Sequence, residues 1–132
     1  MQHMADTEMM KQALGDEYDE MVHPPNIVAP FDHALWKMIL KNLREVYDPE
    51  IPVNIYELGL IYKVEIDQHQ NINVQMTLTS PACPVAGEMP GMVKDAIKPI
   101  EGVADVFVEI IWEPTWNPGM MAETAKYQLN MF

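Results

Sequence analysis

Two short segments of alternating apolar and polar residues constrain the fold of this chain more than any other feature. In residues 60–66 and 72–78 every second side chain is apolar. A period of two with one apolar face is typical of a half-buried β-strand. The polar linker 67–71 fits a turn between two antiparallel strands, so a hairpin is predicted. The apolar side chains expected on its buried face are Leu60, Tyr62, Val64, Ile66, Ile72, Val74, Met76 and Leu78.

A helix is predicted ahead of this hairpin. Asp32 is a suitable N-cap, and Leu35, Ile39 and Leu43 then recur at helical spacing on one face. Two prolines within residues 48–52 end the helix, because proline removes a backbone donor and clashes with the preceding turn.

A second helix and a third strand are predicted after the hairpin. The helix covers residues 84–98 and has proline at its first position, where the missing N–H is harmless. Pro90 is expected to kink this helix or to restart it. Alternation resumes near residues 103–112, and the pair Asn117-Pro118 is expected to begin a C-terminal helix.

The predicted order is therefore α-β-β-α-β with a C-terminal helix. This order indicates an α+β fold, in which helices pack on one face of a small three-stranded sheet. The domain is expected to span residues 33–132. Residues 1–32 are rich in methionine and carry seven acids against one base, with several prolines near their end. They are predicted to form a mobile acidic extension.

Charge and cysteine content narrow the classes of function. The net charge is −12 with only eight Lys and Arg, which argues against nucleic acid and against an anionic membrane surface as partners. A basic or neutral protein partner fits this charge. A single cysteine cannot form an internal disulfide, and no secretory leader or long apolar run is apparent. A reducing cytoplasm is the expected compartment.

Cys83 is the first candidate functional residue. It is expected where a strand ends and a helix begins, and a helix N-terminus favours the thiolate that binds metal or attacks an electrophile. Thr79 and Ser80 could donate hydrogen bonds to its sulfur or cap the turn. The alternative is a buried cysteine that packs as a small apolar residue.

Three carboxylates form the second candidate site. Asp48, Glu50 and Glu57 fall in a proline-stiffened loop before the first strand. Carboxylates can serve as general acids or bases, or as ligands for hard metal ions. The alternative is a rigid loop in which Asp48 and Glu50 accept hydrogen bonds from backbone N–H groups.

Two tryptophans after the last strand form the third candidate site. Trp112 and Trp116 flank Pro114. Tryptophan often anchors protein interfaces, so these residues could form a partner-binding surface. Packing of the tail on the sheet is the alternative interpretation.

Two of these motifs together resemble a known family. They are Asp-Pro-Glu-Ile-Pro-Val-Asn-Ile-Tyr-Glu-Leu-Gly-Leu-Ile-Tyr at 48–62 and Thr-Ser-Pro-Ala-Cys-Pro-Val-Ala-Gly at 79–87. The chain resembles the SufT-like iron–sulfur cluster assembly domains over residues 33–132. That family includes the PaaD proteins and a eukaryotic component of cytosolic iron–sulfur targeting. The tail with Trp112 and Trp116 looks like the SufT branch. Many relatives have Asp where this chain has Glu57.

The resemblance implies an accessory factor in the maturation of iron–sulfur proteins, often dimeric, with a functional cysteine at Cys83. A cluster normally takes four protein ligands, so one thiolate per chain fits transient handling of a cluster or iron rather than a tightly bound cofactor. The expected partners are the assembly machinery and client apoproteins. Two alternatives stay open: an adaptor that docks clients without metal, and a thiol-dependent enzyme that pairs Cys83 with Asp48 or Glu57.

The hairpin also predicts where the two motifs meet. In an antiparallel pair, the start of one strand lies beside the end of the other. Residues 48–59 precede the first strand and residues 79–83 follow the second. Both segments are therefore expected at the same edge of the sheet, where they would form one site.

Overall fold

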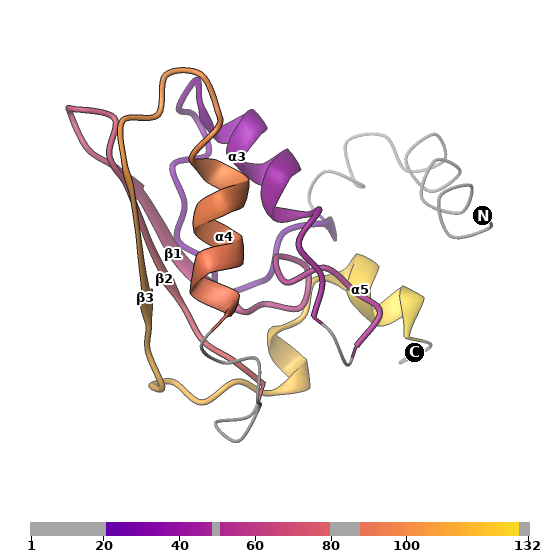
Figure 1. Cartoon of the computed structure of the whole chain (residues 1–132). Helices are drawn as coiled ribbons and strands as arrows, with labels where there is room; N and C mark the ends of the chain where they lie inside the picture. The colour runs from indigo at the N-terminus through magenta and orange to yellow at the C-terminus, as the bar shows by residue number, and fades with distance from the viewer. Residues whose placement is uncertain (1–20, 49–50, 80–87, 130–132) are drawn as a thin grey trace.

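Two helices lie against one face of a three-stranded sheet (Figure 1). The computed structural model describes residues 21–48, 51–79 and 88–129. This arrangement confirms the predicted α+β fold and the order of its elements. Within the described residues, no helix is long and apolar enough to cross a bilayer. The elements are α3 (Trp36–Leu43), β1 (Ile61–Ile66), β2 (Ile72–Met76), α4 (Met89–Ile97), β3 (Val106–Ile110), the 3₁₀ helix η1 (Pro118–Met120) and α5 (Glu123–Gln128).

Strands β1 and β2 form the predicted antiparallel hairpin, with Ile66 opposite Ile72. The predicted alternation is wrong at the start of β1, where the register shifts between Ile61 and Lys63. Ile61 is fully buried, whereas Tyr62 is only partly buried. The physical reason is a β-bulge: one extra residue reverses the faces to which the flanking side chains point.

Strand β3 runs parallel to β2, and α4 makes the crossover that a parallel pair requires. The two strands pair residue for residue, from Ile72 opposite Val106 to Met76 opposite Ile110. This register aligns the apolar side chains of both strands in rows on one face. The buried side chains of α3 and α4 complete the core: Trp36, Ile39, Leu43, Met89, Val93 and Ile97.

Both core helices begin later than the sequence predicted. Helix α3 starts at Trp36 after Leu35, and no side chain caps it, so Asp32 is not its N-cap. Helix α4 starts at Met89, which places Pro90 in the first turn, where the missing N–H breaks no helical hydrogen bond. Pro90 therefore lies in the first turn and does not kink the helix. Residues 84–87 lie outside the described residues.

The segment 21–31 packs against this core. Val22 is 3% exposed. His23 Nδ1 lies 2.6 Å from the hydroxyl of Tyr56. Val28 extends the sheet beside β1: its N–H donates to the carbonyl of Tyr62, and its carbonyl accepts from the N–H of Val64. The domain boundary at residue 32 stays a prediction. A truncation can test it, because residues before this boundary contact the core.

Candidate functional site

The loop that precedes β1 is buried and closely surrounded. We call residues 53–60 the motif loop. Its apolar side chains have no exposed surface: Val53, Ile55, Tyr56, Leu58 and Leu60. Gly59 has φ +82°, and a Cβ built there would lie 2.2 Å from the carbonyl oxygen of Met120. Glycine is therefore required at this position both for the backbone conformation and for the approach of the second segment.

Glu57 lies at the centre of a buried polar network. Its Oε2 accepts hydrogen bonds from Arg44 Nε at 2.9 Å and from Asn54 Nδ2 at 2.8 Å. Its Oε1 accepts a hydrogen bond from the hydroxyl of Thr124. The carboxylate is 3% exposed, so burial would be costly without these donors. Glu57 joins α3, the motif loop and α5 to one another.

Asp48 is also engaged locally. Its Oδ1 accepts a hydrogen bond from the N–H of Ile51 at 3.1 Å, and the residue is 8% exposed. This contact matches the alternative in which the carboxylate satisfies the backbone of a rigid loop. Glu50 lies outside the described residues, so its role stays a prediction.

The tyrosine of the motif loop belongs to an aromatic cluster. Tyr56 contacts Trp36 and His23, and His23 also contacts Phe31. Burial raises the pKa of the Tyr56 phenol, the largest of several influences that include Arg44 and Glu57. Tyr56 is therefore a neutral hydroxyl group in the folded protein at physiological pH.

A segment after β3 crosses the end of the sheet and contacts the motif loop. We call residues 111–122 the C-terminal strap; Figure 1 shows it running from β3 below the sheet toward α5. Trp116 Nε1 donates to the carbonyl of Leu58 at 2.7 Å, and the Tyr62 hydroxyl donates to the carbonyl of Pro114 at 2.6 Å. The N–H of Ala122 donates to the carbonyl of Glu57 at 2.7 Å.

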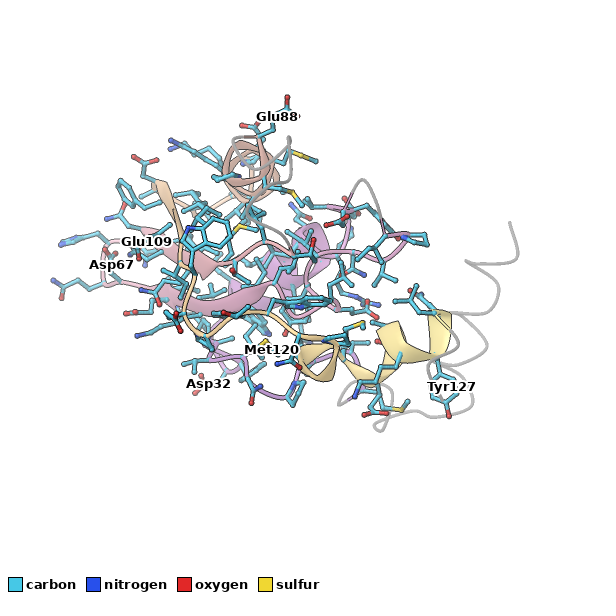
Figure 2. The ribbon with its side chains drawn as sticks, turned by 90° about the horizontal axis from the view of Figure 1, so that it is seen from below. Asp32, Asp67, Glu88, Glu109, Met120 and Tyr127 are labelled. Carbon is cyan, nitrogen blue, oxygen red and sulfur yellow. The ribbon has the colours of Figure 1, made fainter. Side chains whose placement is uncertain are left out.

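Figure 2 shows the strap from below, with the side chains drawn. In Figure 2, Met120 lies on the strap between the sheet and α5, and Glu88 at the start of α4 lies on the far side of the sheet. The predicted N-cap role of Asn117 is correct for η1, because its Oδ1 accepts from the N–H of Gly119. Helix α5 begins separately after Ala122, which has no side-chain cap.

An open groove lies between the strap and the end of β2. We call it the Trp groove; residues 77–79, Trp112, Glu113, Thr115 and Trp116 line a space of about 360 Å³. Trp112 is 46% exposed and Glu113 is exposed. The described lining of the groove therefore combines two indole groups with one carboxylate.

The predicted meeting of the two motifs can be followed as far as Thr79. The N–H of Thr77 donates to the carbonyl of Leu60 at 2.8 Å, so the start of β1 lies beside the end of β2. Trp116 joins the two segments, because it contacts Leu58 and lines the groove with Thr79. Ser80 and Cys83 lie outside the described residues, and a single site with the thiol stays a prediction.

Helix α4 does not support the prediction that a helix N-terminus activates the thiol of Cys83. That helix begins at Met89, six residues after Cys83, and not near Pro84. Within the described part of the chain, no three His, Cys, Asp or Glu residues gather in a way that could hold a metal ion. The described carboxylates Asp48 and Glu57 instead accept hydrogen bonds from nearby protein groups.

Sequence reasoning missed the partners of Glu57. Asn54 lies three residues earlier, and the spacing suits a local turn in which its side chain accepts from the N–H of Glu57. That signal was available in the sequence. Arg44 and Thr124 gave no such signal, because their contacts with Glu57 depend on the packing of distant segments.

The chain matches a known protein family and is similar to named bacterial proteins. The family described as "Iron-sulfur cluster assembly protein" matches residues 37–110. A Porphyromonas gingivalis protein named "Fe-S protein maturation auxiliary factor" is 45% identical over 91 residues, which are 69% of this chain and 87% of that protein. The Staphylococcus aureus "Fe-S protein maturation auxiliary factor SufT" is 40% identical over 86 residues, covering 65% of this chain and 98% of that protein.

A solved structure shares the fold. The Bacillus anthracis domain of unknown function DUF59 superposes with a TM-score of 0.68 at 35% identity. The similarity covers 75% of this chain and 94% of that one.

Proposed function

Because the chain belongs to the iron–sulfur cluster assembly protein family, we propose that it is an accessory factor in the maturation of iron–sulfur proteins. The observation that carries the proposal is the family match over residues 37–110, which includes the motif loop and the segment around Cys83. The relatives are named as auxiliary factors, which supports a carrier or adaptor in preference to an enzyme.

The cargo in this proposal is a cluster or iron, handled transiently at Cys83. One thiolate cannot complete the four ligands that a cluster normally takes, so a second copy, a client or a small molecule must supply the others. Incomplete coordination suits transfer, since the cargo is then easier to release. The same proposal places this function in the cytoplasm. Its partners there are the assembly proteins and the client apoproteins.

The Trp groove supports an additional role as an adaptor, in which the chain binds a partner protein. It is next to Thr79, which precedes Cys83 by four residues, and four residues span at most about 14 Å. A partner bound in the groove would therefore be within reach of the thiol. A thiol-dependent enzyme is less supported, because the described carboxylates Asp48 and Glu57 are already hydrogen-bonded.

The test is rescue of an iron–sulfur enzyme in a bacterial strain that lacks this protein. The activity and iron content of a [4Fe–4S] dehydratase are measured with the wild-type chain and with Cys83→Ser. We expect wild-type rescue and loss of rescue by the variant, because serine removes the soft ligand and keeps the size. Circular dichroism checks that the variant is folded.

Two further results separate the alternatives. Full rescue by folded Cys83→Ser would exclude cargo handling through the thiol and favour the metal-free adaptor. Absence of rescue by the wild-type chain would contradict the maturation function itself. Anaerobic incubation of the purified chain with iron and sulfide, followed by visible absorption, tests directly whether Cys83 is needed to hold the cargo.

A further inference from the structure

The Trp groove has the composition of a site for a cationic side chain. Its lining contains two indoles, and the faces of tryptophan attract cations more strongly than those of other aromatic residues. Among the described residues that line it, Glu113 alone carries a charge. An indole and a carboxylate both favour a positive charge, whereas an acidic ligand would meet repulsion.

The chain does not supply this cation from its described residues. Glu113 takes part in none of the ion pairs found there. The cations of these ion pairs each contact a different carboxylate; they are Arg44, Lys63, Lys98 and Lys126. No lysine or arginine is among the described residues that line the groove. None of the cations in the described part of the chain therefore neutralises the carboxylate at its rim.

The size of the groove indicates how much of a partner enters it. About 360 Å³ is near the lower limit of small-ligand pockets, which span roughly 300–1,000 Å³. One long side chain with its flanking backbone fits such a space, and a folded surface does not enter it. The net charge of −12 adds a long-range attraction for a basic segment.

We propose that the Trp groove binds an arginine side chain carried by an exposed segment of a partner protein. The guanidinium stacks on an indole and pairs with the carboxylate of Glu113, and its planar shape suits this role better than the ammonium of lysine. Naming the partner as a client or assembly component rests on the proposed function. The preference for a cation rests on the groove alone.

The test uses capped Gly-Arg-Gly as the probe, with matched peptides in which citrulline or glutamate replaces arginine. Citrulline keeps the shape of arginine without its charge. Binding is followed by the NMR signals of the three indole N–H groups. Trp36 is 3% exposed and serves as the internal control. We expect the arginine peptide to shift the signals of Trp112 and Trp116 and to bind about threefold to tenfold tighter than the citrulline peptide.

Variants separate the charge from the apolar surface. Trp112→Leu keeps an apolar side chain and removes the indole face, and Glu113→Gln removes the charge. Each is expected to weaken arginine-peptide binding about threefold or more while leaving citrulline-peptide binding unchanged. Glu101→Gln, an exposed acid outside the groove, is the control and should bind like the wild type. Circular dichroism confirms that all three variants are folded.

Several outcomes would overturn the proposal. They are equal binding of the arginine and citrulline peptides, tighter binding of the glutamate peptide, and unmoved signals of Trp112 and Trp116 up to the solubility limit of the peptide. The rescue experiment is independent of this result. A chain that binds the arginine peptide as expected but rescues no iron–sulfur enzyme would support the groove and contradict the maturation function.

Discussion

The indole N–H of Trp116 donates a hydrogen bond of 2.7 Å to the carbonyl oxygen of Leu58, 58 positions earlier in the chain. The contact fixes the C-terminal strap against the motif loop. It also positions Trp116 in the wall of the Trp groove, beside the end of β2. The strap therefore has two roles, since it completes the core around the motif loop and forms one side of the groove.

Gly59→Ala should test how closely the strap approaches the motif loop. The new Cβ would lie 2.2 Å from the carbonyl oxygen of Met120, in a backbone conformation that disfavours side chains. We expect the free energy of unfolding in urea to fall by at least about 2 kcal/mol.

The chain offers a matched control for that substitution. Gly91 lies in α4, and a Cβ there would meet nothing within 4 Å. Gly91→Ala should leave stability unchanged or raise it by up to about 1 kcal/mol, because alanine favours the helix. Equal losses from the two substitutions would show that Gly59 has no special role.

Thr124→Val should reveal the network around Glu57. Valine keeps the shape but removes the hydroxyl that donates to the buried carboxylate. We expect a loss of about 1–3 kcal/mol in the free energy of unfolding, the usual cost of an unsatisfied buried polar group. Thr124→Ser keeps the hydroxyl and should lose less. In a double-mutant cycle with Glu57→Gln, additive effects would mean that the two side chains are not coupled.

Tyr56 should make the protein sensitive to alkali. Burial raises the pKa of its phenol above the ordinary value of about 10, so the folded state keeps the proton that the unfolded chain releases. This contribution to stability is fully present below about pH 10 and is lost as the pH rises further.

The corresponding measurement is the free energy of unfolding against pH for wild type and Tyr56→Phe. The fall above about pH 10 should be shallower in the variant, even though the loss of the contact with His23 lowers its overall stability. The same alkaline slope in wild type and Tyr56→Phe would contradict the argument.

Two truncations should locate the edge of the domain. Removal of residues 1–32 takes away the buried Val22, the contact of His23 with Tyr56 and the pairing of Val28 with β1. We expect that chain to keep its α+β circular dichroism. It should be about 2 kcal/mol or more less stable than a chain lacking residues 1–20 only. Equal stability would place the boundary at residue 32, as composition alone predicts.

The sequence by itself determined the order of the elements and the family. The alternation in residues 72–78 and the helical spacing of Ile39 and Leu43 depend only on which face of one element meets the core, so they can be recognised locally. The two long motifs identified the iron–sulfur assembly family, which the comparison confirms. The meeting of β1 with the end of β2 followed from hairpin topology.

Only the tertiary structure decided three features. They are which side chains at the start of β1 face the core, the environment of Glu57 and the path of the strap. The bulge at Tyr62 coincides with its hydrogen bond to Pro114, 52 residues away. Glu57 accepts hydrogen bonds from Arg44 and Thr124. Arg44 precedes β1 along the chain, whereas Thr124 follows β3. Periodicity reports whether a side chain faces the interior, but not which distant segment it meets there. That choice depends on the simultaneous packing of all the elements.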